Sequence, residues 1–129
     1  MQIEGIVQPG DQRGRLLGFP TANIALPTEN EQLWEERSGV WSGLATLDDG
    51  TCHLATISIG RRPTFYRKDG ELLAEAFLHD FQGDLYGRKL VINLEHFLRT
   101  QAKFDSVDEL ISAMEADAQN TEKLVTLQP

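Results

Sequence analysis

The chain has 129 residues, of which 40% are hydrophobic, and this size and composition suit one domain with a single core. Its formal net charge is −8, so a broad attraction to the phosphate backbone of nucleic acid is not expected. Any phosphate-bearing ligand must therefore be a small molecule that backbone N–H groups and a metal ion hold locally.

The single cysteine, Cys52, excludes an intrachain disulfide and fits a reducing compartment. The sequence has no run of about 18 apolar residues and no charged start followed by an apolar segment. We therefore expect one cytoplasmic, monomeric domain over residues 1–129 that binds neither nucleic acid nor membranes.

Short apolar runs separated by turn residues predict a series of strands. The first is expected at residues 1–7, and a shorter one at residues 22–26 follows a loop rich in glycine and proline. Residues 27–38 are polar and acidic and form a long excursion, with a helical turn expected around residues 32–36. Such an excursion is either a functional lid or a simple insertion.

Four further strands are expected at close intervals, each bounded by a turn signal. They cover residues 39–47, 51–59, 72–81 and 88–98. Because no helical pattern separates them, they favour an antiparallel barrel or sandwich.

One helix is expected near the C-terminus, at about residues 106–120. Ser106 and Glu109 form a capping box at its start. The positions that repeat at helical spacing after it are apolar: Val107, Leu110, Ile111, Met114 and Ala118. We interpret this apolar stripe as core packing rather than a ligand contact, and we expect residues 121–129 to fray.

The most informative stretch is residues 14–24, GRLLGFPTANI, which suits neither a helix nor a strand. Pro20 lacks a backbone N–H group and pushes Phe19 out of the α region. The stretch ends in two neutral oxygen-bearing side chains, Thr21 and Asn23. Mg²⁺ prefers such hard ligands and usually takes only one or two from the protein. This stretch therefore favours a phosphate–metal site over a plain surface turn.

Glu75 lies within a predicted strand whose alternation places it on the same face as Phe77 and His79, opposite Ala74 and Ala76. A carboxylate on a partly apolar face is costly unless it is paired or used in chemistry. From the pattern alone, a solvated glutamate on the outer face is the more ordinary interpretation.

The other polar candidates are ambiguous. The three histidines have no HxxxH or HxH spacing, which argues against a zinc site, although zinc stays beside magnesium among the metals to be tested. The pair Arg61-Arg62 either binds a phosphate or solvates a loop, and we favour the second interpretation. Arg99 suits an anion, a planar ring or an ordinary surface position.

Taken in order, these motifs resemble the riboflavin kinase family from about Gly5 to Asp117. The matching pieces are Gly5 to Asn23, Gly39-Val40-Trp41, Ile59 to Phe65, Glu75 with Asp80 to Gly87, Leu98-Arg99, Lys103-Phe104 and Ser106 with Leu110. The sequence departs from the family pattern at Trp41, Ser58, Ala74 and Phe77, where Tyr, Asn, a β-branched residue and His are common. These departures concern the shape of the pocket rather than the reaction.

The resemblance implies a six-stranded antiparallel Greek-key barrel with a C-terminal α-helix packed on it. It also implies Mg²⁺-dependent transfer of the γ-phosphoryl group of ATP to the terminal ribityl hydroxyl of riboflavin, giving FMN and ADP. Glu75 would be the catalytic base. The residues implied in nucleotide and phosphate binding are Gly10, Gly14, Arg15, Gly18, Pro20, Thr21 and Asn23, of which Thr21 and Asn23 would also contact Mg²⁺. The residues implied in flavin binding are Arg99, Tyr86 and Phe104.

Two other functions stay open from the sequence. One is a non-catalytic flavin or nucleotide sensor on the same barrel, and the other is an interaction module that uses the acidic residues 28–36. In many bacteria the resembling module is the C-terminal half of a bifunctional FAD synthetase. This chain has no His-x-Gly-His motif, so adenylylation of FMN would need a fused or separate FMN adenylyltransferase.

Overall fold

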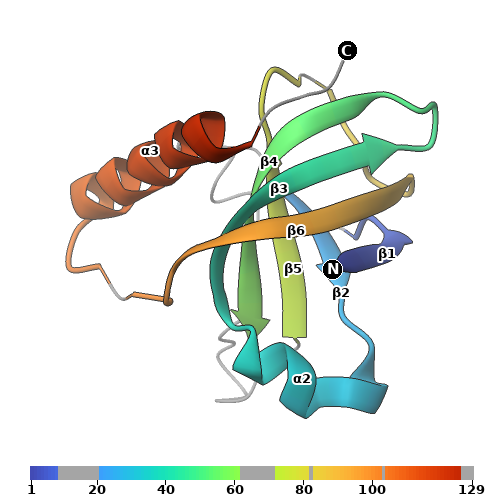
Figure 1. Ribbon diagram of the computed structural model, residues 1–129, viewed down its shortest axis with the longest axis horizontal. Helices are drawn as coiled ribbons and strands as arrows, with labels where there is room; N and C mark the ends of the chain where they lie inside the picture. Colours follow the sequence, from blue (N-terminus) through green and yellow to red (C-terminus); the bar gives the residue numbers. More distant parts are fainter. Residues whose placement is uncertain (9–20, 62–71, 82, 103, 126–129) are drawn as a thin grey trace.

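The structure, a computed structural model, describes residues 1–8, 21–61, 72–81, 83–102 and 104–125. Within these residues the chain forms six antiparallel strands, which Figure 1 shows as a curved sheet. They are β1 (Gln2–Ile6), β2 (Thr21–Ala25), β3 (Gly39–Leu47), β4 (Cys52–Arg61), β5 (Leu72–Leu78) and β6 (Lys89–Arg99). Their order is β1-β6-β3-β4-β5-β2. A bridge between Gln8 and Asn23 brings the two edges together, so the sheet is a nearly closed barrel and the predicted fold is confirmed.

The barrel interior is filled by its own strands. Ile24 pairs with Ala74 and Ala22 with Ala76, and all four side chains are buried in the core. Small residues on β2 and β5 leave room for the larger Ile57 of β4, which is fully buried. The predicted alternation along β5 is confirmed, because its even-numbered residues face the core.

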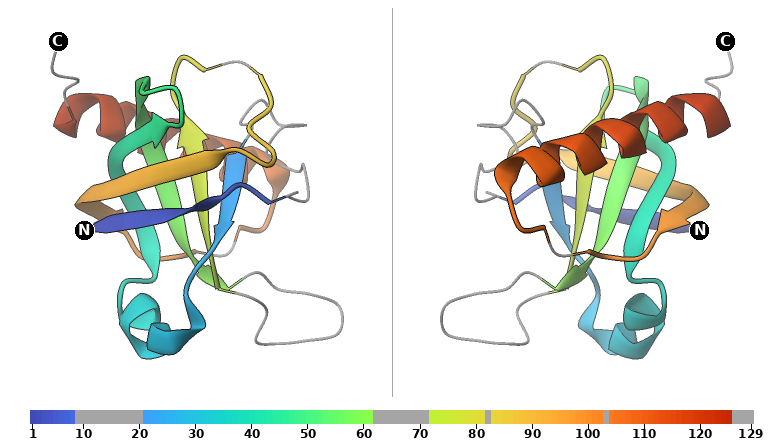
Figure 2. Two further views of the ribbon diagram at one scale, coloured as in Figure 1. Left: turned by 90° about the vertical axis from the view of Figure 1, so that its right-hand side faces the viewer. Right: turned by 90° about the vertical axis from the view of Figure 1, so that its left-hand side faces the viewer.

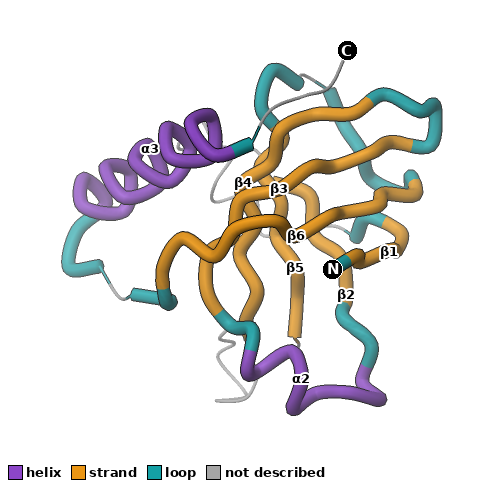
Figure 3. The backbone as a smooth tube through the Cα atoms, viewed as in Figure 1, coloured by secondary structure: helices purple, strands orange, loops and turns teal. Residues whose placement is uncertain are grey.

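A short helical excursion joins β2 to β3, as predicted. It consists of η1 (Thr28–Asn30) and α2 (Glu31–Glu36), at one end of the barrel in Figure 3. Trp34 of α2 is buried in the core cluster. The Nε of Arg61, at the end of β4, donates to Glu35 at 3.0 Å, and Glu31 lies 3.5 Å from its Nη2. Arg61 therefore contacts carboxylates of α2, which lie beside the end of β4.

Helix α3 (Val107–Leu124) starts where the capping box predicts. The Ser106 hydroxyl accepts a hydrogen bond from the Glu109 N–H at 3.2 Å, and the Glu109 carboxylate accepts one from the Asp105 N–H at 3.0 Å. The helix continues beyond the predicted end, and both Thr121 and Val125 are buried. The expectation of fraying is therefore wrong for residues 121–125. None of the helices in the described part of the chain has the length and apolar composition needed to cross a membrane.

The apolar stripe of α3 is not core packing, so that interpretation is wrong. No stripe residue belongs to the core cluster, and Val107 is 48% exposed. The buried residues of α3 are Asp117 and Thr121. The physical reason is that side chains of the strands already fill the barrel, so α3 lies across the outer face of the sheet instead (Figure 2).

Polar contacts attach the C-terminal half of α3 to the barrel. The Thr121 hydroxyl lies 2.7 Å from that of Thr56, which in turn lies 3.0 Å from Nε2 of His79. Nδ1 of His79 is 3.6 Å from the Glu122 carboxylate. His79 is only 6% exposed, and burial lowers the pKa of its imidazole below the ordinary 6.5, although Glu122 and Asp80 oppose the shift.

This lowered pKa predicts a pH dependence of folding stability. Because the folded state disfavours the imidazolium form, the unfolded chain binds more protons as the pH falls below about 6.5. The free energy of unfolding should therefore fall between pH 7 and pH 5, and His79→Gln should flatten that slope. Urea unfolding across this range measures it. His96→Gln, at an exposed position of β6, should keep the wild-type slope. An equal slope in wild type and His79→Gln would contradict the assignment.

Candidate active site

One cross-strand row of residues runs around the outer face of the barrel. In spatial order its members are Gln8, Asn23, Glu75, Ser58, Val40 and Arg99. Directly opposed residues of neighbouring strands point to the same face of a sheet. The adjacent row of Ile24, Ala74 and Ile59 points into the core, so this row, which we call the outer belt, points outward.

Asn23 and Glu75 stand side by side in the outer belt, on β2 and β5. Their opposed positions in the register put their Cβ atoms about 5 Å apart. Asn23 is 2% exposed, whereas Glu75 is half-buried with Ser58 on its other side. Glu75 is therefore not a glutamate extended into open solvent. The structure brings the predicted acid and amide together.

The amide oxygen of Asn23 has an unusual environment. In the part of the chain that the structure describes, Oδ1 is buried and accepts no hydrogen bond. A buried acceptor without a partner costs free energy, and such an atom points to a missing ligand. Thr21 lies two positions earlier on the same face, so its hydroxyl is directed to the same side of β2. An amide oxygen with a nearby hydroxyl fits a hard cation such as Mg²⁺.

Among the described residues, no group of three or more His, Cys, Asp or Glu side chains is arranged to hold a metal ion. A cation at Asn23 would therefore depend on neutral protein oxygens and the oxygens of a bound ligand. This ligand set matches the way Mg²⁺ is usually held by proteins and phosphates together.

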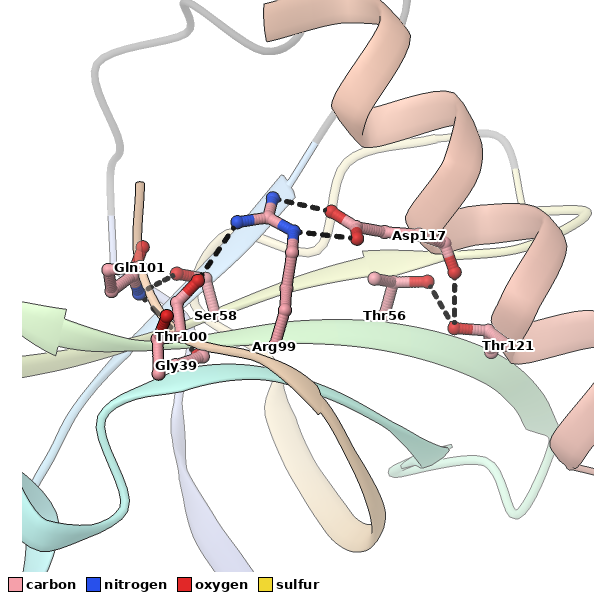
Figure 4. Close-up of polar contacts among 8 residues, drawn as sticks. All are labelled: Gly39, Thr56, Ser58, Arg99, Thr100, Gln101, Asp117 and Thr121. Atoms are coloured by element: carbon pink, nitrogen blue, oxygen red, sulfur yellow. Dashed lines mark hydrogen bonds and ion pairs between the residues drawn. The ribbon is translucent and has the colours of Figure 1, made fainter. Parts of the chain in front are cut away.

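Arg99 occupies the far end of the outer belt, and its guanidinium group is held within the protein (Figure 4). Its Nε donates to Oδ1 of Asp117 at 2.9 Å and its Nη2 to Oδ2 at 2.7 Å, while Nη1 donates to the Thr100 carbonyl at 3.1 Å. The guanidinium carbon also lies 5.8 Å from the centroid of the Phe104 ring. From the sequence, Arg99 suited an anion, a planar ring or an ordinary surface position. In the structure it contacts both an anion, Asp117, and a ring, Phe104.

Two residues of this region were not found by sequence reasoning. Asp117 is an acid on the inward side of α3, four positions before Thr121, and that spacing is the signal that could have found it. Gln101 follows β6, and its Nε2 donates to the Ser58 hydroxyl at 2.8 Å and to the Ile59 carbonyl at 3.0 Å. Its contacts are non-local, and the sequence holds no signal for them.

The other predicted site residues are placed differently. Gly10, Gly14, Arg15, Gly18 and Pro20 lie outside the described residues. Tyr86 is 61% exposed just before β6, whereas Arg99 is at the end of that strand, about 30 Å farther along it. The structure does not bring Tyr86 together with Arg99 and Phe104.

The proposed base and the end of the outer belt at Arg99 are separated by a definite distance. Glu75 and Arg99 lie on strands three spacings apart, which corresponds to about 14 Å around the barrel. Between these two residues Val40 is buried, and the Ser58 hydroxyl accepts a hydrogen bond from Gln101.

Comparison with known proteins identifies the family. The Flavokinase family model, described as riboflavin kinase, matches residues 1–125. Human riboflavin kinase is 32% identical over 124 residues, which are 95% of this chain and 79% of the human protein. The structure of riboflavin kinase from Trypanosoma brucei matches with a TM-score of 0.72 and 26% identity, covering 95% of this chain and 78% of that one.

A bacterial relative is longer. The bifunctional riboflavin kinase/FMN adenylyltransferase of Listeria monocytogenes is 38% identical over 118 residues, which are 92% of this chain and 36% of that protein. The chain thus spans about a third of the length of this relative. With a family match over nearly the whole described fold and a human relative covered over most of its length, the chain belongs to the riboflavin kinase family.

Proposed function

We propose that this domain is an ATP- and Mg²⁺-dependent riboflavin kinase. It transfers the terminal phosphoryl group of ATP to the terminal ribityl hydroxyl of riboflavin and releases FMN and ADP. The observation that carries the proposal is the register that places Glu75 opposite Asn23, whose buried amide oxygen accepts no hydrogen bond within the described part of the chain. Membership of the family supports the choice of substrates.

Glu75 acts as the general base. Its carboxylate accepts the proton of the ribityl hydroxyl as the hydroxyl oxygen attacks the phosphorus atom, and the bond to the ADP oxygen breaks on the opposite side. Phosphoryl transfer is accelerated chiefly by positioning and charge neutralisation, with a carboxylate to receive the proton. Its position between Asn23 and Ser58 gives Glu75 a fixed place on β5.

The residues that would hold Mg²⁺ are Thr21 and Asn23. When bound, the ion supplies positive charge beside the phosphate oxygens of ATP. Because both protein ligands are neutral, they leave that charge available for the phosphates. This arrangement lets a protein with a net charge of −8 bind a polyanion without a basic surface.

The flavin ring is bound at the other end of the outer belt, beside Arg99 and Phe104. The apolar stripe of α3 lies next to them in sequence and is half-buried or exposed rather than in the core. Val107, at the start of the stripe, is 48% exposed and follows Phe104 by three residues.

The first test is direct conversion of riboflavin. Wild-type protein incubated with Mg²⁺-ATP and riboflavin should produce FMN that chromatography detects, and EDTA should abolish the product. Binding of riboflavin without FMN would instead support the sensor alternative. Thermal-shift titrations with ATP and riboflavin that show no stabilisation would favour a plain interaction module.

Replacement of the proposed base gives a second prediction. Glu75→Gln keeps the shape of the side chain but cannot accept the proton, so kcat should fall about 10²- to 10⁴-fold while riboflavin affinity is kept. Steady-state kinetics and a fluorescence titration measure the two quantities. Glu95→Gln, at an exposed position of β6, serves as the matched control and should keep the wild-type rate. Retained turnover in Glu75→Gln would rule out the role.

A third prediction concerns the metal. Asn23→Ala removes a buried oxygen that makes no hydrogen bond in the described structure. The Mg²⁺ concentration for half-maximal activity should therefore rise about tenfold or more, because a ligand to the ion is lost. The same change at Asn93, on the outer side of β6, should leave the Mg²⁺ requirement unaltered. An unaltered requirement in Asn23→Ala would exclude Asn23 as a ligand.

A further inference from the structure

Asp117 is a buried carboxylate that the proposed reaction does not use. It is 5% exposed on α3 and receives two hydrogen bonds from Arg99, whose side chain is 30% exposed. A carboxylate at such a site must be paired, because an isolated buried charge is strongly unfavourable. The helix has other contacts with the barrel as well, because Thr121 and Glu122 contact Thr56 and His79.

The pair fixes the orientation of Arg99. The bidentate contact with Asp117 holds the guanidinium group in the plane of that carboxylate, and the bond from Nη1 to Thr100 adds a third point of attachment. Figure 4 shows the guanidinium between α3 and the end of β6, bonded to both. A lysine at position 99 would have no planar fork to hold in this way.

The pair also balances the charge of Arg99. An anionic ligand that approached the guanidinium would meet the Asp117 carboxylate beside it, so the pair disfavours anions. The guanidinium carbon lies over the Phe104 ring, 5.8 Å from its centroid, so one face of the guanidinium is directed at Phe104. The Arg99 side chain is 30% exposed, and what it retains for a ligand is its other face. Guanidinium planes and aromatic rings are both stacking surfaces for planar groups.

We propose that Asp117 is a positioning residue, which holds Arg99 beside Phe104 as a flat, charge-compensated surface that recognises an uncharged planar ring system by stacking. This inference deepens the proposed function, on which it rests, because it assigns recognition of the substrate ring to an ion pair between α3 and β6. Asp117 acts through Arg99 and does not itself contact the substrate.

Asp117→Asn tests the proposal, because it keeps the size of the side chain and removes its charge. Riboflavin binding is measured by flavin fluorescence in the presence of Mg²⁺-ADP, and the KM values for riboflavin and ATP are measured separately. We expect the Kd and KM for riboflavin to rise about tenfold or more while the KM for ATP stays unchanged. Lumiflavin, which lacks the ribityl chain, should lose affinity by a similar factor, because the effect acts on the ring.

Thr121→Val is the matched control for helix attachment. It removes the hydroxyl contacts with Thr56 and with the backbone carbonyl of Asp117 but leaves the Asp117 carboxylate to pair with Arg99. It should lower Tm and leave the riboflavin Kd at the wild-type value. Arg99→Lys, which keeps the charge without the planar fork, should weaken riboflavin binding as Asp117→Asn does.

The outcomes separate this inference from the proposed reaction. A wild-type riboflavin Kd in Asp117→Asn, or an equal loss in Thr121→Val, would overturn the positioning role even if the wild type makes FMN. Wild-type protein that binds riboflavin without making FMN would refute the kinase activity, while the variants would still decide the role of Asp117. Wild-type protein that binds neither riboflavin nor lumiflavin would overturn the inference.

Discussion

The register between β2 and β5 is the constraint on which the candidate site depends. Inside the barrel it pairs Ile24 with Ala74, and outside it pairs Asn23 with Glu75. A shift by one residue would exchange the two faces, placing a carboxylate in the core and an isoleucine in the site. Packing of the interior therefore fixes the position of the outward side chains, and the same interactions that stabilise the fold align the proposed base with the proposed metal ligand.

A filled interior also determines where ligands can bind. Because the strands occupy the barrel with their own side chains, both the outer belt and α3 lie on the outside. The helix is held there by polar contacts at Asp117, Thr121 and Glu122, which leave its apolar stripe partly exposed. Only Val107 of the stripe is exposed, and the other four residues are half-buried.

Sequence patterns correctly predicted the structural features that interactions between residues close in sequence determine. Alternation from residue 74 to residue 78 identified the two faces of β5, and the capping box placed the start of α3. The same reasoning failed for the apolar stripe, because helical periodicity shows which residues share a face but not whether the core has room for them. The pairing of Asp117 with Arg99 joins residues 18 positions apart on different elements, so no single motif contains it.

The outer belt handles positive charge differently near Asn23 and near Arg99. At Asn23 the proposed neutral ligands would leave the charge of a bound cation available, so attraction for phosphates would come from the ion rather than from basic side chains. At Arg99 the protein does supply a cation, but Asp117 compensates it and leaves a planar surface. The belt would thus bind a strongly charged group at one end and an uncharged ring at the other. A substrate carrying a ring at one end and a reacting hydroxyl at the other can then lie along it in only one direction.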